Sequence, residues 1–423
     1  MLWIDVVFWG TYFVSLYITI FLVYTFLEKN PREKKPVLKK HPYVSVIIPA
    51  YNEENTIANT IKSAINMDYP RKFLEIIVIN DGSKDKTLSI AKNIAEKTKD
   101  ILIIVMNQKN AGKGTSMNRA IAKARGEFVI SLDADSFVAK DTLKKMLPYF
   151  EDKKVASVSA VMKVRTPKNI LQQLQWLEYI LYAFMKIVLT TIHCLHVTPG
   201  PFTIYRKSAL NDIGGFDENS IVEDQEIAYR LQRKHYRLVQ SYEGDVTTIA
   251  PRTLKELYAQ RKRWFKGSII TLYQHKDMIF NKKYGDFGMY QLPSLLGGMM
   301  LLFAVIIMVV RGFIVPLYDQ IRHLILLNFD LSLYYTTNLS RMLSGFTNTL
   351  FSFDYAKLFI IIVLFSVNIA LLIKAHKYTN EKIKIANIIP LVLFFIVYFI
   401  ILSFMWIGAI IDLIKSKQKN NWG

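Results

Sequence analysis

The chain has 423 residues, of which 52% are hydrophobic, and carries a formal net charge of +20 at pH 7. This length can hold two ordinary domains or one domain with membrane spans, and the apolar composition favours the second arrangement. Much of the basic surplus lies beside apolar runs, so it indicates membrane lipid as a partner and not nucleic acid. A single cysteine, Cys194, excludes an intramolecular disulfide.

The first element is an apolar run over residues 3–27. As a helix it would span about 37 Å, at roughly 1.5 Å per residue, which exceeds the hydrocarbon core of about 30 Å. We therefore expect a transmembrane helix within residues 1–28. Residues 29–42 are strongly basic and contain prolines. They predict a linker on the cytoplasmic side, with the following domain in the cytoplasm of a multi-pass cell-membrane protein.

Residues 43–160 alternate between apolar runs of strand length and helical segments. Near-continuous apolar strands between helices predict an α/β domain whose mostly parallel sheet is covered on both faces. The expected strands are "VSVII", "LEIIVIN", "ILIIVM", "EFVISL" and "VASVSA". Ligands bind at the carboxyl ends of such strands, and the polar clusters "PAYNEE", "INDGSKD" and "SLDADS" stand at three of those ends. The three clusters should converge on one crevice.

Two later segments, about 169–192 and 254–273, are apolar but interrupted by polar residues. This composition favours helices that lie in the membrane interface over helices that cross it. The first includes Glu178 and Lys186, and the second includes "QRKRW". We place both within a cytoplasmic domain over residues 43–270.

Residues 290–414 form a C-terminal transmembrane region. Within it, residues 291–310, 356–373 and about 387–411 have the length and apolarity of spans. Residues 318–350 are mixed in character and either cross the membrane or do not. Three spans would put the basic tail, residues 415–423, outside, and a fourth would return it to the cytoplasm.

The stretch "SLDADS" places two carboxylates at a strand end. Asp133 and Asp135 are two residues apart, so on an extended strand they face the same side. Two such close carboxylates repel each other, and Mg²⁺ or Mn²⁺ shared with phosphate oxygens would relieve that repulsion. A solvated loop with two surface acids is the alternative. Tyr51, Asn52 and Glu53 stand where a helix begins, but Asn52 could simply be its N-cap, and Asp81 before Gly82 could simply belong to a turn.

Lys113 in "NAGKGTSMNRA" predicts a phosphate-facing cation at a helix start. The segment is not a P-loop, because Asn107 occupies the position of the required first glycine. Glu223 and Asp224 open a later helix, either as acids favoured by the helix dipole or with one of them as a general base.

Gln260, Arg263 and Trp264 lie together in "QRKRW". An arginine can pair with a diphosphate through two hydrogen bonds, and an indole can stack on a sugar. The alternative is a basic aromatic stripe at the lipid headgroups.

In the order "PAYNE", "NDGS", "GKGTSMN", "DAD", "GPFTIYRKSAL", "VED" and "QRKRW", between membrane helices, these motifs resemble the membrane-embedded family 2 glycosyltransferases. Among them the pattern is most similar to the poly-N-acetylglucosamine synthases, and less to the hyaluronan, chitin and cellulose synthases. The resemblance covers residues 43–270. It implies a GT-A fold, that of the nucleotide-diphospho-sugar transferases, joined to transmembrane and interfacial helices.

The resemblance also implies roles for the residues that bind the donor and metal. Glu53 and Asp81 would contact the uridine of a UDP-sugar, with Tyr51 beside the base. Lys113 would approach the nucleotide or the donor sugar. Asp133 would lie near the ribose and the metal, and Asp135 would coordinate Mg²⁺ or Mn²⁺.

A second set of residues would serve the acceptor and the leaving group. Asp224 would deprotonate the acceptor hydroxyl, with Glu223 beside it on the acceptor side. Gln260, Arg263 and Trp264 would hold the diphosphate, with Trp264 bordering the acceptor.

The implied activity is inverting, metal-dependent transfer from a UDP-sugar, UDP-N-acetylglucosamine among the candidates. It would extend a β-linked polysaccharide and pass it through the spans. A non-processive transfer to a lipid carrier or glycolipid is the alternative, and a non-enzymatic membrane protein with a nucleotide-binding domain is a further one. Val222 replaces the usual threonine, "TPGPFTIY" replaces the acceptor loop of cellulose synthases, and one span precedes the domain where several relatives have two. The last two departures bear on processivity and secretion. The resemblance identifies no partner subunit.

Overall fold

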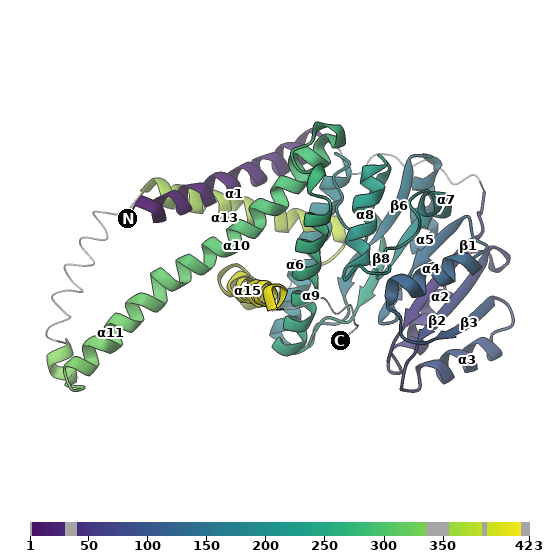
Figure 1. Cartoon of the computed structure of the whole chain (residues 1–423), viewed down its shortest axis with the longest axis horizontal. Coiled ribbons are helices and arrows are strands. Elements are labelled where there is room, and N and C mark those ends of the chain that lie inside the picture. Colours follow the sequence, from purple (N-terminus) through teal and green to yellow (C-terminus); the bar gives the residue numbers. More distant parts are fainter. Residues whose placement is uncertain (1, 30–39, 336–354, 383–386, 416–423) are drawn as a thin grey trace.

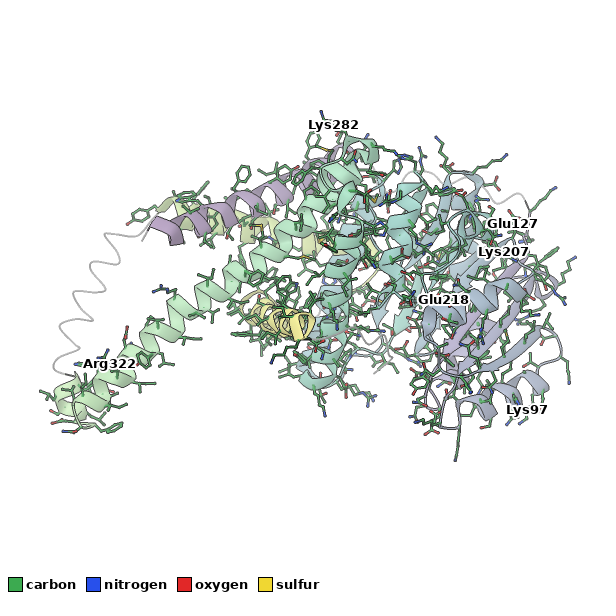
Figure 2. The ribbon with its side chains drawn as sticks, viewed as in Figure 1. Lys97, Glu127, Lys207, Glu218, Lys282 and Arg322 are labelled. Atoms are coloured by element: carbon green, nitrogen blue, oxygen red, sulfur yellow. The ribbon has the colours of Figure 1, made fainter. Side chains whose placement is uncertain are left out.

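The computed structural model describes residues 2–29, 40–335, 355–382 and 387–415. The sheet domain forms one end of the molecule, and long apolar helices extend from it to the other end (Figure 1). Charged side chains such as Lys97 and Glu127 project from the surface of the sheet domain (Figure 2). The basic tail and most of the basic linker fall outside the described residues.

An eight-stranded sheet organises the domain, in the order β3-β2-β1-β4-β7-β6-β8-β5. Strands β3, β2, β1, β4, β6 and β8 run in one direction, whereas β7 and β5 run opposite. The strands are β1 (Val44–Ala50), β2 (Leu74–Asp81), β3 (Leu102–Gln108), β4 (Phe128–Ser131), β5 (Ser136–Val138), β6 (Val155–Val164), β7 (Thr203–Arg206) and β8 (Arg237–Thr248). The predicted α/β domain with a mostly parallel sheet is confirmed.

Helices cover both faces of the parallel half because alternate strand residues face opposite sides. Val46 and Ile48 of β1 join one core with α2 (Ile57–Ile65) and α3 (Thr87–Lys97). Ile47 joins the opposite core with α4 (Lys113–Lys123). All seven residues of β1 are buried, which explains its mostly apolar sequence.

The sheet departs from the expected order at β6. This strand was predicted as part of the parallel run, but β7 lies between it and β4 and pairs antiparallel with both. The four residues of β7 follow a long helical excursion, and such a short segment gives little periodic signal. Short helices α5 (Thr142–Met146) and α7 (Lys207–Asp212) complete this part of the domain.

Three helices lie behind the carboxyl ends of the strands. Helix α6 (Ile170–Thr190) packs against β6 and β8 on one side and against α13, α14 and α1 on another. Helix α8 (Glu223–Arg233) contacts β8, and α9 (Leu254–Gln274) packs against α8 and α15. Helices α6 and α9 coincide with the segments predicted to lie in the membrane interface. In the structure they connect the sheet domain to the apolar helices.

Four helical stretches of the described chain are long and apolar enough to cross a membrane. They cover Trp9–Glu28, Phe287–Ile307, Leu358–Thr379 and Ile388–Lys415. The helices that carry them are α1 (Leu2–Glu28), α10 (Leu292–Val309), α13 (Tyr355–Thr379), α14 (Ile388–Leu393) and α15 (Phe399–Lys415).

Two further details concern these helices. The segment Phe394–Tyr398 between α14 and α15 is a turn of π-helix. Helix α11 (Val315–Leu326) continues α10 outward (Figure 1). The segment 318–350, for which the sequence left two alternatives, is described only as far as residue 335.

Candidate active site

A cavity of about 470 Å³ opens where the sheet, α6, α8 and α9 meet. Its wall includes Leu295 of α10, so it extends from the sheet to a candidate membrane span. All but one of the residues predicted for the site line this cavity, namely Tyr51, Glu53, Lys113, Asp133, Asp135, Glu223, Asp224, Gln260, Arg263 and Trp264. The predicted crevice forms from the clusters after β1 and β4, which are neighbours in the sheet, whereas the cluster after β2 is not among the lining residues.

The loop after β1 is braced by the loop after β2. Asn52 adopts a positive φ of 55°, its backbone N–H donates to Ser83 Oγ, and its Oδ1 accepts from the Lys84 N–H at 2.9 Å. The Glu53 N–H donates to Thr87 Oγ1 at 2.7 Å. These bonds hold the Glu53 carboxylate at the cavity wall. Thr56, and not Asn52, is the N-cap of α2.

Asp81 is the exception among the predicted residues, since it is not among those that line the cavity. It is buried, and its two carboxylate oxygens accept from the backbone N–H groups of Ala111 and Gly112, both at 2.9 Å. In this geometry Asp81 holds the loop that leads into Lys113. The expected contact with uridine stays a prediction, and it would require these bonds to be shared.

Lys113 joins two of the acidic motifs. Its Nζ lies 2.7 Å from Asp133 Oδ1 and 2.7 Å from Glu223 Oε1. Burial opposes the charged form, but the two carboxylates raise the pKa of Lys113 above its ordinary value. The loop at Gly200 approaches this group so closely that a Cβ there would collide with Lys113 Nζ and lie 2.7 Å from Asp133 Oδ2. Only glycine fits at position 200 without displacing the cluster.

Asp135 has no cation beside it among the described residues. Burial, together with the carboxylates of Asp133 and Glu53, raises the pKa of Asp135 to about 7. Ser136 Oγ donates to Asp135 Oδ1 at 3.0 Å and lowers the pKa of Asp135, and Lys113 lowers it by less. The carboxylates of Glu53, Asp133 and Asp135 thus line the same cavity, and Lys113 forms an ion pair with Asp133.

The start of α8 supplies two acids with opposite properties. Burial, together with the neighbouring Glu223, raises the pKa of Asp224 to about 7. Burial alone would also raise the pKa of Glu223, but Lys113 holds it below its ordinary value. Glu223 is therefore ionised in an ion pair, whereas Asp224 can hold or release a proton near neutral pH. That property suits a general base.

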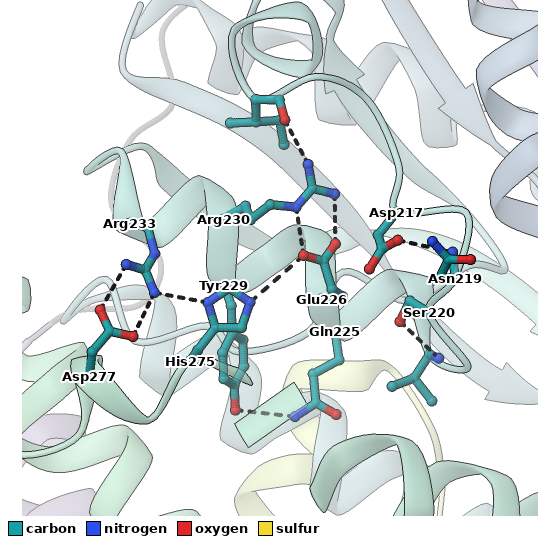
Figure 3. A network of polar contacts seen from close by, with 12 residues as sticks. Asp217, Asn219, Ser220, Gln225, Glu226, Tyr229, Arg230, Arg233, His275 and Asp277 are labelled. Carbon is teal, nitrogen blue, oxygen red and sulfur yellow. Dashed lines mark hydrogen bonds and ion pairs between the residues drawn. The ribbon is translucent and has the colours of Figure 1, made fainter. Parts of the chain in front are cut away.

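A network on the other side of α8 fixes this helix (Figure 3). Arg230 donates to both oxygens of Glu226 at 2.6 Å and to the Ile213 carbonyl at 2.7 Å. Arg233 binds both oxygens of Asp277 at 2.8 Å, after the end of α9. In addition, the Thr198 Oγ1 donates to the Asp224 carbonyl, which ties the loop before β7 to the first turn. The acids at the start of α8 are thereby held against the cavity.

The motif "QRKRW" lies on helix α9, and some of its residues line the cavity whereas another forms a buried ion pair. Arg263 and Trp264 line the cavity, and the buried Oε1 of Gln260 has no hydrogen-bond partner in the described part of the chain. An orphaned buried acceptor in a cavity wall indicates a donor group that a ligand supplies. Arg261, which the sequence reading did not single out, is buried in an ion pair with Glu178 of α6 at 2.5 Å.

One face of α6 belongs to the site and was missed from the sequence. Glu178, Tyr179, Tyr182 and Lys186 all line the cavity, together with His196 from the loop that follows α6. Their spacing puts them on one stripe of the helix, and polar groups at positions 178, 182 and 186 recur every four residues in an apolar background. That recurrence was the available signal, and it was interpreted as contact with the membrane interface.

Residues 45–214 match the family model described as glycosyl transferase family 2. The chain carries a glycosyl transferase family 2 domain. This finding confirms the family that the motifs indicated.

Curated relatives extend the similarity beyond that domain. The chain is 31% identical over 262 residues to the poly-beta-1,6-N-acetyl-D-glucosamine synthase of Staphylococcus aureus strain MSSA476, and 30% identical to that of Staphylococcus epidermidis. The alignment covers 60% of this chain and 63% of each synthase. The match therefore leaves more than a third of each synthase unaligned.

A solved structure shows the fold over nearly the whole chain. The mannosyltransferase PcManGT from Pyrobaculum calidifontis, in complex with GDP-Man and Mn²⁺, superposes with a TM-score of 0.65 and 18% sequence identity. The match covers 98% of this chain and 99% of that one. The GT-A fold of the glycosyl transferase domain and its arrangement with the apolar helices thus recur in that enzyme.

Proposed function

We propose that the protein is an inverting, metal-dependent glycosyltransferase that uses a UDP-sugar, UDP-N-acetylglucosamine first among the candidates, to extend a β-linked polysaccharide. The observation that carries this proposal is the single cavity in which Asp133 and Asp135, Asp224, and the Gln260–Trp264 stretch converge. The 31% identity to the staphylococcal synthases supports the choice of sugar. The catalytic domain would face the cytoplasm.

The acids at the cavity wall suit a divalent cation. Burial raises the pKa of Asp135, and repulsion from the Asp133 and Glu53 carboxylates adds to that rise. A bound Mg²⁺ or Mn²⁺ would neutralise Asp135 and Asp133 and supply a positive charge for the diphosphate of the donor.

The remaining residues supply the steps of a single displacement. Asp224 takes the proton of the acceptor hydroxyl while that oxygen attacks the anomeric carbon from the side opposite UDP. The bond between the anomeric carbon and the diphosphate oxygen breaks, and the electron pair leaves with UDP. Arg263 stabilises the departing diphosphate electrostatically, and Trp264 borders the acceptor sugar.

Transfer of one sugar to a lipid acceptor is the second candidate. The presence of Leu295 in the cavity wall favours it, because this residue belongs to a candidate membrane span. A lipid acceptor could reach the cavity along that helix.

The decisive experiment incubates the membrane-reconstituted protein with a panel of labelled UDP-sugars and measures sugar consumption and product length. We expect consumption of one UDP-sugar and a long polymer. A product with a single added sugar on lipid would refute the extension of a polysaccharide and support the second candidate. UDP binding without turnover of any donor would overturn both.

A further inference from the structure

The inner end of the cavity contains a lysine that none of the steps above uses. Lys186 is only 2% exposed, yet it lines the cavity. Among the described residues Lys186 forms no ion pair. Its Nζ lies over the Tyr182 ring, 5.3 Å from the ring centroid, in a cation–π contact. A buried ammonium group without an anionic partner is costly, so its position calls for a ligand.

The neighbouring side chains add a second donor. The amide nitrogen of Gln291 can only donate, so His196 Nδ1 accepts from it at 3.0 Å. Burial lowers the pKa of His196 to about 4, so the ring is neutral and its Nε2 carries the proton. That proton goes to the Tyr182 hydroxyl oxygen, 3.0 Å away. The Tyr182 hydroxyl can then donate its own hydrogen to another acceptor.

Tyr182 and Lys186 both line the cavity, so the hydroxyl of one and the ammonium group of the other can act there as donors. Tyr182 keeps 39% of its surface exposed, which leaves it accessible to a ligand. Burial lowers the pKa of Lys186 to about 8, so the group is still mostly charged at neutral pH. The nearby carboxylate is Asp224, which acts on Lys186 through space but forms no ion pair with it.

We propose that Lys186 and Tyr182 form an acceptor subsite that binds the phosphate group of a membrane lipid. Two donors that converge beside the proposed base match an oxyanion. The same cavity is lined by the apolar residues Val197, Phe265 and Leu295, and the last belongs to a candidate span. An oxyanion joined to an apolar chain is a lipid phosphate, and neither a neutral glycan nor free phosphate has both properties.

This inference rests on the proposed function for its meaning, since the lipid would be the primer or the final acceptor of the sugar. It can nevertheless be tested by binding alone. A polyprenyl phosphate and the matched polyprenol, which lacks the phosphate, are titrated onto the full-length protein in detergent, with binding followed by native mass spectrometry. Inorganic phosphate, added as a competitor, separates recognition of the whole lipid from recognition of its headgroup.

The wild-type protein should bind the polyprenyl phosphate at least about tenfold more tightly than the polyprenol, because hydrogen bonds to charged groups are worth more than one factor of ten. Lys186→Met should remove this preference, and Tyr182→Phe should reduce it. Lys186→Arg should keep most of it. Lys97→Met, on the distant exposed end of the sheet domain (Figure 2), is the matched control and should change nothing. Retained UDP binding shows that each variant is folded.

Equal binding of the two lipids by the wild type would overturn the subsite, as would a Lys186→Met variant that keeps the preference. Competition by inorganic phosphate as strong as that of the lipid would show a headgroup site without lipid recognition, which also contradicts the proposal. A Lys186-dependent preference in a protein that turns over no UDP-sugar would instead refute the proposed function and leave the subsite standing.

Discussion

At the scale of single residues, the site depends on which carboxylates have a cation beside them. Lys113 pairs with Asp133 and Glu223, whereas Asp135 and Asp224, both partly buried, form no ion pair within the described part of the chain. The pKa of each of these last two is raised to about 7. This fits the roles that we propose, with Asp135 as a metal ligand and Asp224 as the proton acceptor.

The first prediction concerns the proposed base. Asp224→Asn should abolish sugar transfer while UDP binding stays nearly unchanged, because the base acts on the acceptor and not on the nucleotide. The measurements are turnover of labelled UDP-sugar and calorimetric titration of UDP. Asp212→Asn, a surface carboxylate paired with Lys234, is the control and should keep activity. Parallel loss of transfer and of UDP binding would count against the role of Asp224.

The pH dependence follows from the same residue. A base must be deprotonated, and the pKa of Asp224 is raised to about 7. The rate at saturating donor and metal should therefore fall by about tenfold for each pH unit below 7 and level off above it. UDP affinity, measured at the same metal concentration, should lack this limb. A rate that stays level down to pH 5 would show that Asp224 is not the titrating group.

Metal removal tests the proposed role of Asp135. Chelation of divalent cations should weaken UDP binding, and Asp135→Ala should weaken it similarly even when metal is present. Both effects arise because the diphosphate would lose the positive charge that holds it. Asp100→Ala, an exposed carboxylate paired only with Arg71, serves as the control. UDP binding that does not depend on metal would contradict the assignment of Asp135.

At the scale of elements, the contact between α8 and α9 sets the position of the base. A Cβ at Gly267 of α9 would lie 2.5 and 2.6 Å from the two methyl carbons of Val222, the residue that precedes Glu223. The glycine thus allows α9 to approach the first turn of α8. Val222 acts here as a packing residue.

Gly267→Ala should therefore displace the first turn of α8. We expect a loss of about 1–3 kcal/mol in the free energy of unfolding, and a lower turnover rate with little change in UDP affinity. The double variant with Val222→Ala removes both colliding methyl groups and should recover part of the activity. Unfolding and kinetics on the same preparations measure both effects. If the double variant is no better than Gly267→Ala, the packing explanation is wrong.

At the scale of the whole molecule, a buried polar group joins the sheet domain to the apolar helices. Glu178 Oε2 accepts from Arg261 of α9 at 2.5 Å and from the Tyr398 hydroxyl at 2.7 Å. The guanidinium of Arg261 also stacks over Trp264, 4.3 Å from its ring centroid. The helix that carries the predicted diphosphate-binding residues is thereby fixed to a helix of the membrane region.

Removing the Glu178 carboxylate at the centre of this group should lower the free energy of unfolding. Glu178→Ala leaves the Arg261 charge buried and unpaired, so we expect a loss of about 3–5 kcal/mol in the free energy of unfolding. Tyr398→Phe removes one hydrogen bond and should cost only about 1 kcal/mol. Thermal unfolding in detergent compares the two variants. Equal losses would show that the ion pair is not the main contribution.

Much of the site could be predicted from the sequence because its motifs follow buried strands. The strands β1, β2 and β4 can be recognised in the sequence as near-continuous apolar runs. The polar groups directly after them lie at the same edge of a parallel sheet. Asp133 and Asp135 therefore reached the cavity as expected. The position of Asp81 could not be predicted, because its bonds to the 111–112 backbone depend on a neighbouring loop.

The sequence by itself determined the fold class, the four apolar runs and the order of the motifs, since these depend on local periodicity and composition. Only the tertiary structure decided which face of α6 meets the cavity, and therefore that Lys186 and Tyr182 belong to it. A helix of apolar residues with a few polar ones fits either a membrane interface or a protein interior. Its partners are distant in sequence, so packing alone chooses between the two.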